Sequence, residues 1–186
     1  MSSHPRLEEL VTAIGVEKVV ELADYAPEDK TWVPALIEAC KYSKPRNRKA
    51  AWVLHHIFLR HTKLIEPKVE ALIDVLHASE DGSVHRELLK ILVEIKINEL
   101  EWVEFSPLLF DLGVGILFDE AQTKGMHYIA IRLAERFMNS EKERIDAVDA
   151  IKQMLFNSYT GEKSMCNAAD KAMKRIGKRK ISITKS

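Results

Sequence analysis

"VPALIEACKYS" (Val33–Ser43) and "VEALIDVLHAS" (Val69–Ser79) are two copies of one pattern, and they decide the fold of this chain. The copies begin 36 residues apart and share Val, Ala, Leu, Ile, an acidic residue after them and a final Ser. Self-similarity at a fixed spacing is typical of proteins that stack one small structural unit. The sequence therefore predicts a repeat architecture.

The segments that follow these copies also correspond to each other. Each places a small or apolar residue first and apolar residues four and seven positions later, which is one face of a helix. The four sets of anchors begin 38, 42 and 39 residues apart, and the last two sets are the weaker matches. The anchors are Ala50, Leu54 and Ile57; Leu88, Leu92 and Ile95; Ala130, Ala134 and Phe137; and Ala169, Met173 and Ile176.

Almost the whole chain has helical periodicity, and alternation with a period of two, which strands need, is absent. The ranges expected to be helical are 6–12, 16–25, 29–42, 46–61, 66–78, 83–97, 107–118, 122–139, 141–156 and 163–178. Ser106-Pro107 is interpreted as a helix start, with Ser as N-cap and Pro at the first helical position. Gly113 and Gly115 weaken the helix 107–118, so we expect close helix packing there. A break is also expected at residues 43–45.

The pattern resembles HEAT and armadillo repeats, in which helix pairs stack into an α-solenoid. "NRKAAWVL" (Asn47–Leu54) is the best single match to a HEAT second helix. The resemblance implies an all-α, right-handed α-solenoid of about four helix pairs over residues 28–180, with a helical cap at 1–25. Together with a basic tail at 181–186, these form one predicted domain, 1–186. An irregular helical bundle with one duplicated hairpin is the alternative.

Charge is unevenly distributed, although the chain has a net charge of zero. Residues 41–63 carry seven cations and no acid, and residues 171–186 do the same. The remaining residues therefore carry a net charge of −14, so local binding surfaces are compatible with the neutral average.

Several features predict a cytoplasmic protein with no membrane segment. No apolar run approaches the roughly 20 residues that span a bilayer, and the first residues lack the pattern of a secretory signal. Cys40 and Cys166 have no CxxC spacing, so both are predicted to be free thiols.

Histidines raise the question of a metal site, and their spacing argues against one. His55 and His56 are adjacent and His61 lies five residues further on, whereas a helical metal pair needs a spacing of three or four. We therefore predict no metal and no cofactor. His85 and His127 align at the start of successive second helices, where Asn47 and Cys166 occupy the same position. Polar residues there are expected to cap backbone N–H groups.

The residues that point away from the anchors form the predicted binding surface. In HEAT-like proteins the second helices line the concave surface, so the resemblance implies a shared groove. Its aligned positions are Lys49, Trp52, His56 and Arg60; Glu87, Lys90, Glu94 and Asn98; Ile129, Arg132, Arg136 and Ser140; and Ala168, Lys171, Arg175 and Arg179. The groove would be basic at both ends and interrupted by Glu87 and Glu94. A solvated charged face without a ligand is the alternative.

The predicted binding residues are Lys49, Trp52, His56, Arg60, Lys90, Arg132, Arg136, Lys171, Arg175 and Arg179. Trp32 and Trp102 are interpreted as packing residues, whereas Trp52 faces away from the anchors. Common enzyme motifs such as GxSxG, GxGxxG, Walker A and HExxH are absent. The sequence favours a non-enzymatic scaffold for a protein partner, for example an acidic one, without excluding an enzyme.

Nucleic-acid binding is the competing function. The chain resembles HEAT-like DNA glycosylases, which function in DNA alkylation repair, in fold class and in having a basic groove. That resemblance implies an acidic catalytic residue beside aromatic residues, for which Glu94, and Asp111 after Trp102, are the candidates. Neither residue lies on a family motif. The sequence leaves the oligomeric state open.

Overall fold

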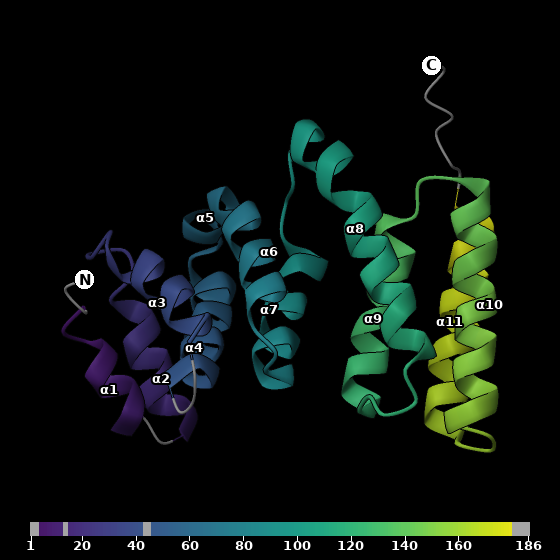
Figure 1. Cartoon of the computed structure of the whole chain (residues 1–186), viewed down its shortest axis with the longest axis horizontal. Helices are drawn as coiled ribbons and strands as arrows, with labels where there is room; N and C mark the ends of the chain where they lie inside the picture. The colour runs from purple at the N-terminus through teal and green to yellow at the C-terminus, as the bar shows by residue number, and fades with distance from the viewer. Residues whose placement is uncertain (1–3, 13–14, 43–45, 180–186) are drawn as a thin grey trace. The chain divides into compact units, whose positions relative to one another are not determined.

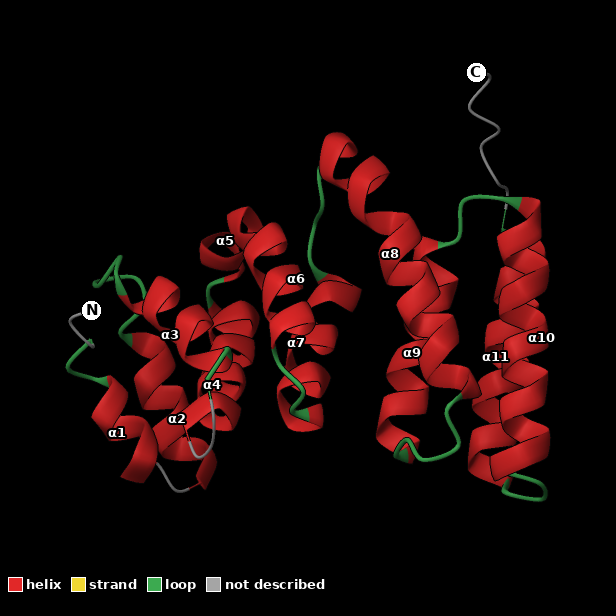
Figure 2. Ribbon diagram, in the orientation of Figure 1, coloured by secondary structure: helices red, strands yellow, loops and turns green. Residues whose placement is uncertain are grey.

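A computed structural model of the chain describes residues 4–12, 15–42 and 46–179. These residues form helices, turns and loops and contain no strand (Figure 2). The chain folds into two compact units, Met1–Ile97 and Asn98–Ser186. The break expected at 43–45 and the basic tail at 181–186 lie outside the described residues, and the single domain over 1–186 stays a prediction.

The first unit consists of two layers of helices (Figure 1). The first helices of the successive pairs are α1 (Leu7–Thr12), α3 (Trp32–Cys40) and α6 (Val69–Ala78). The second helices are α2 (Gly15–Asp24), α4 (Arg46–Arg60) and α7 (Gly82–Glu94). Two short elements, α5 (Thr62–Ile65) and η1 (Glu66–Lys68), connect α4 to α6. α4 packs between α2 and α7, so the second helices lie side by side in one layer.

The second unit repeats the same arrangement with two longer pairs. Its helices are α8 (Glu99–Phe118), α9 (Lys124–Phe137), α10 (Glu141–Ser158) and α11 (Lys163–Lys178). α8 packs on both α9 and α10, and α11 packs on both α9 and α10. α9 and α11 are therefore the neighbouring second helices of this unit.

The predicted stacking register is confirmed by burial. Eleven of the twelve anchor residues are buried, and Met173 is half-buried. Small residues such as Ala50 and Ala130 allow the neighbouring helix to approach closely, while Leu54 and Phe137 fill the space between layers. The repeated spacing of four and three residues thus marks the core face of each second helix.

The start of α8 differs from the prediction. The helix expected at 107–118 begins at Glu99, and Pro107 lies inside it. Asn98 and Glu101 form a reciprocal capping box: the Asn98 side chain accepts a hydrogen bond from the Glu101 N–H, and the Glu101 carboxylate accepts one from the Asn98 N–H. This start signal satisfies two backbone donors at once, so Ser106 is not an N-cap but a buried residue within the helix.

Gly113 and Gly115 are only two residues apart but differ in environment. A Cβ atom on Gly113 would lie 3.0 Å from Leu133 Cβ, 3.1 Å from Ala134 N and 3.2 Å from Ala130 O, all on α9. The expected close packing is therefore confirmed at Gly113. It is wrong at Gly115, where a Cβ atom would meet nothing within 4 Å.

The polar residues at the start of the second helices hold the loop before them. His85 Nε2 donates to the Ser79 carbonyl at 2.5 Å, and His127 Nε2 donates to the Asp119 carbonyl at 3.1 Å. The thiol of Cys166 contacts a carbonyl in the same way, at 3.7 Å. Only Asn47 accepts from a backbone N–H, so the predicted capping of N–H groups is wrong at the other three positions. The groups that need partners there are the carbonyls left at the end of each first helix.

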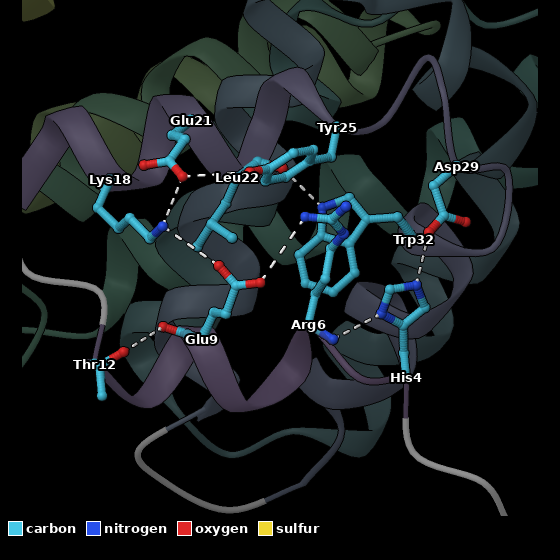
Figure 3. Close-up of polar contacts among 10 residues, drawn as sticks. All are labelled: His4, Arg6, Glu9, Thr12, Lys18, Glu21, Leu22, Tyr25, Asp29 and Trp32. Atoms are coloured by element: carbon cyan, nitrogen blue, oxygen red, sulfur yellow. Dashed lines mark hydrogen bonds and ion pairs between the residues drawn. The ribbon is translucent and has the colours of Figure 1, made fainter.

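Polar and aromatic contacts hold the N-terminal helix pair together and join it to α3 (Figure 3). Trp32 is fully buried, and its indole N–H donates to the Leu22 carbonyl at 2.8 Å. The Arg6 guanidinium lies 3.5 Å from the centre of the Tyr25 ring. Lys18 reaches carboxylates of both helices, Glu9 on α1 and Glu21 on α2. The segment predicted as a helical cap is thus a helix pair that packs on α3 and α4.

The remaining predicted packing residues also have identified environments. Trp102 is half-buried, stacks on Phe137 at a centroid distance of 5.0 Å and donates to Asn139 Oδ1. Cys40 and Cys166 are free thiols, as predicted. Burial raises the pKa of Cys40, so this thiol is unreactive.

Candidate binding face

The solvent side of α4 carries an aromatic pair. Trp52 and His56 are half-buried, lie one turn apart and meet edge to face with ring centroids 6.0 Å apart. Leu59, at the next helical position on this side, is 61% exposed. Two of the predicted binding residues therefore lie together, beside an apolar residue that the prediction missed. Leu59 lies seven residues, about two helical turns, after Trp52, and this spacing in the sequence indicates that both residues share one side of the helix.

The cations on one edge of α4 bind the N-terminal helix pair. Arg60 holds Asp24 of α2 with two hydrogen bonds, Nε to Oδ1 at 2.6 Å and Nη2 to Oδ2 at 2.8 Å. This pair lowers the pKa of Asp24 and raises that of Arg60. Lys49 donates to the backbone carbonyl of Val11 at 2.8 Å. Both cations lie on the predicted helix, but their polar groups are already bound within the protein.

The opposite edge of α4 binds α7 through a buried carboxylate. His55 Nδ1 donates to Glu87 Oε2 at 2.9 Å, and Lys90 Nζ donates to both oxygens of Glu87 at 2.9 Å. Arg86 Nε lies 3.2 Å from Oε1. Burial acts to raise the pKa of Glu87, but the hydrogen bonds from His55 and Lys90 outweigh it and lower the pKa to about 2. Glu87 therefore remains ionised and links two repeats.

His56 lies between these two edges and is held in its neutral form at pH 7. Burial lowers its pKa most, and the neighbouring His55 lowers it further. A neutral imidazole beside an indole gives the middle of this face an aromatic, weakly polar character. We call Trp52, His56 and Leu59 the aromatic strip of α4.

Four aligned groove positions differ from the prediction. Glu87 is 5% exposed and points toward α4, and Ile129 is 9% exposed and belongs to the core. Asn98 and Ser140 lie beyond their predicted helices and cap α8 and α10 instead. Glu87 can be buried because its carboxylate has three positively charged or N–H donors around it, which replace the hydrogen bonds to water that burial removes.

In the second unit, the cations of α11 reach back to α9. Arg175 holds Glu135 with two hydrogen bonds, at 2.5 Å from Nε to Oε1 and 2.6 Å from Nη2 to Oε2, and this pair raises the pKa of Arg175. Arg179 Nη1 donates to the backbone carbonyls of Glu135 and Arg136. The Arg136 guanidinium lies 5.1 Å from the centre of the Phe137 ring. Lys171 and Arg132 are exposed.

The ten predicted residues thus fall into two groups of five. Each unit brings its own five onto neighbouring second helices: Lys49, Trp52, His56, Arg60 and Lys90 in the first unit, and Arg132, Arg136, Lys171, Arg175 and Arg179 in the second. A single groove along four repeats stays a prediction. Lys174 and Lys178, both exposed on α11, were missed, although they belong to the basic block read from the sequence.

Catalytic and metal-binding candidates remain scattered. Glu94 is an exposed residue at the end of α7, and Asp111 is an exposed residue on α8, on the same helix as Trp102. In the described part of the chain, no three His, Cys, Asp or Glu side chains are grouped so that they could hold a metal ion. Among the same residues, no helix combines the length and apolar character that a membrane span requires.

The stacked helix pairs and their side-by-side second helices define an α-helical repeat protein of the solenoid class. The sequence model of the family described as HEAT repeat domain matches residues 6–176. The chain therefore belongs to the HEAT repeat domain family, whose repeats commonly form scaffolds for protein interaction. Searches of curated proteins and of solved structures found no match.

Proposed function

We propose that this protein is a non-enzymatic scaffold that binds a protein partner through the exposed faces of its second helices. In the first unit, the contact surface is the aromatic strip of α4 with the flanking side chains Lys49, Arg60 and Lys90. In the second unit, it comprises Arg132, Arg136, Lys171, Arg175 and Arg179. The observation that carries the proposal is the half-buried Trp52–His56 pair, which sits on a helix held from both sides.

The aromatic strip has the properties of an energetic centre in a protein interface. Tryptophan is enriched among residues that contribute most to protein binding, and such residues lie among polar neighbours that exclude water. The neighbours here are immobilised before binding, Arg60 by Asp24 and Lys90 by Glu87. A preorganised face loses less side-chain entropy when a partner binds. An interface of small area can therefore still bind with useful affinity.

Charge pairing on this face favours protein over nucleic acid. Phosphate binding depends on cations that release counterions, and Lys49, Arg60 and Lys90 already contact acceptors within the chain. The neighbouring helix α2 presents exposed carboxylates at Glu17 and Glu21. A mixed surface of this kind suits a protein partner better than a continuous polyanion. The cytoplasmic location remains a prediction from the sequence.

Affinity purification from the native cell, carried out with and without nuclease treatment, tests the proposal. Tagged wild type is compared with Trp52→Ala and Leu59→Glu on the aromatic strip. The control is Phe156→Ala, because Phe156 is an apolar residue that is 80% exposed on α10. Quantitative mass spectrometry should show proteins that both strip variants lose and the control keeps. Because Leu59 is largely exposed, Leu59→Glu separates lost binding from lost folding, which circular dichroism also monitors.

Two results would contradict the proposal. If the wild type and both strip variants capture the same proteins in the same amounts, the strip is not the binding face. If the captured material disappears on nuclease treatment, the partner is nucleic acid rather than protein.

A further inference from the structure

The two basic blocks of the sequence have the same charge but different environments in the folded protein. In the first block, residues 41–63, most cations have an acceptor inside the chain. These contacts are Lys41–Glu38 at 3.5 Å, Arg46–Glu8 at 2.7 Å, Lys49–Val11 O at 2.8 Å, Arg48–Asp81 at 2.8 Å and Arg60–Asp24 at 2.6 Å. Of the cations that the structure describes in this block, Lys63 alone lacks such a contact. Four of these five contacts join neighbouring helix pairs, so most of this block is used within the stack.

The second block behaves differently, because three of its lysines have no acceptor within residues 4–12, 15–42 and 46–179. Lys171, Lys174 and Lys178 are exposed on α11, and no carboxylate in the described residues pairs with them. At 100° per residue, the three side chains lie within an arc of about 60°, on the side opposite the buried Ala169 and Ile176. We call these three residues the lysine strip of α11; it is about 10 Å long.

Folding alone does not account for the lysine strip. Cations in the last turn of a helix interact favourably with its dipole, which explains Lys178. Lys171 and Lys174 lie before the last turn, where this effect has decayed. Lys174 and Lys178 are four residues apart, and Lys171 stands four residues before Arg175, so these like charges repel along the helix, and the opposite charge at this spacing, Asp170 before Lys174, offsets only part of that repulsion. Binding of an anion would relieve this repulsion and so lower the electrostatic free energy of the strip.

We infer that the lysine strip of α11 binds an acidic segment of a partner polypeptide, rich in Asp and Glu. This inference rests on the proposed function in taking the ligand to be protein, and it shares Lys171 with the surface proposed for the second unit; it uses a different helix from the aromatic strip of α4. Its basis is charge complementarity between three exposed lysines and a short run of carboxylates.

The surroundings of the strip favour a polypeptide over nucleic acid. α11 contains no aromatic residue on which a base could stack. Its arginines Arg175 and Arg179 are already bound to α9. The adjoining helix α10 presents an exposed carboxylate at Asp146, which repels an extended polyanion, and a second at Asp149 that pairs with Lys152 at 3.4 Å. A short acidic peptide can bind along the strip without crossing that helix.

Fluorescence anisotropy with the full chain and a labelled peptide of ten glutamates tests this inference. The strip variant is Lys171→Gln, Lys174→Gln and Lys178→Gln combined. A matched control, Lys30→Gln, Lys96→Gln and Lys142→Gln combined, removes three exposed and unpaired lysines elsewhere, so both proteins lose the same net charge. With about threefold affinity per exposed ion pair, the loss of three pairs should make the strip variant bind roughly thirtyfold more weakly, and the control should bind about as well as wild type.

Each outcome is decisive. Binding of the wild type should weaken between 50 and 300 mM salt, because exposed charges are screened over about 10 Å or less. No peptide binding at 50 mM salt, or equal losses in the two triple variants, would overturn the inference. Tighter, strip-dependent binding of a labelled ten-nucleotide DNA would also overturn it, in favour of nucleic acid. Leu59→Glu should leave peptide binding unchanged, so this result and the test of the aromatic strip are independent.

Discussion

Replacing Gly113 by alanine should destabilise the second unit, although alanine is the better helix former. Alanine in place of glycine inside a helix gains about 1 kcal/mol of stability. Against this gain, the new Cβ atom would lie 3.0–3.2 Å from three atoms of α9. Two of them, Ala134 N and Ala130 O, are backbone atoms that cannot rotate away. Relief therefore requires a shift of the whole helix α9 away from α8.

The expected size of the effect follows from these opposing terms. Overpacking of a well-packed contact costs about 1–3 kcal/mol, so the net loss at Gly113 is about 0–2 kcal/mol. Gly115 provides the matched control on the same helix, because a Cβ atom there meets nothing within 4 Å. Gly115→Ala should keep the full gain of up to about 1 kcal/mol. The two single substitutions should therefore differ by roughly 1–3 kcal/mol in the free energy of unfolding.

Urea denaturation followed by far-UV circular dichroism measures this difference. Thermal midpoints should follow, with a 2 kcal/mol gap corresponding to about 4–8 °C for a chain of this length. An unchanged dependence of the unfolding free energy on urea would show that the denatured state is unaffected. Equal stabilisation by Gly113→Ala and Gly115→Ala would refute the reasoning, because it would mean that α9 does not constrain α8 at this contact.

Two further substitutions test the links between repeats. Glu87 has its pKa lowered from 4.5 to about 2 in the folded protein, so its stabilising effect is present above pH 4.5 and is lost as the pH falls toward 2. Wild type should lose up to about 3 kcal/mol relative to Glu87→Gln across that window, measured by urea denaturation at several pH values; parallel pH profiles would contradict the role of Glu87. Tyr159→Phe should cost about 1–3 kcal/mol, because the Tyr159 hydroxyl donates to Nδ1 of the fully buried His127 at 2.8 Å. Tyr128→Phe, at a half-buried tyrosine, is the control in thermal denaturation, and equal midpoints for the two variants would refute the assignment.

Local sequence signals accounted for most of the helices and for their stacking. The positions of Ala50, Leu54 and Ile57 on one side of α4 follow from a 3.6-residue period, which is a property of adjacent residues. The signals failed where two of them compete. Ser106-Pro107 has the form of a helix start, but the capping box at Asn98 and Glu101 begins the helix earlier. Both signals are local, and only the second satisfies two backbone donors.

The binding face was predicted less completely, because orientation on a helix does not determine a side chain's partners. The prediction placed Trp52 and His56 on the solvent side of α4, where they lie. It placed Glu87 on the same surface, whereas the pairing of Glu87 with His55 across the stack allows it to be buried. Leu59 was not among the predicted residues, most of which are charged, although it lies on the same side of the helix, seven residues after Trp52.

By itself, the sequence determined the all-α repeat architecture, the core face of each second helix and the two basic blocks. Only the tertiary structure decided which of those charges remain available. Arg60 meets Asp24 across 36 residues, Arg48 meets Asp81 across 33, and Arg175 meets Glu135 across 40. These separations are close to one repeat, so the acceptors come within reach only when the helix pairs stack. Lys171, Lys174 and Lys178 are exposed and have no such acceptor among the residues that the structure describes.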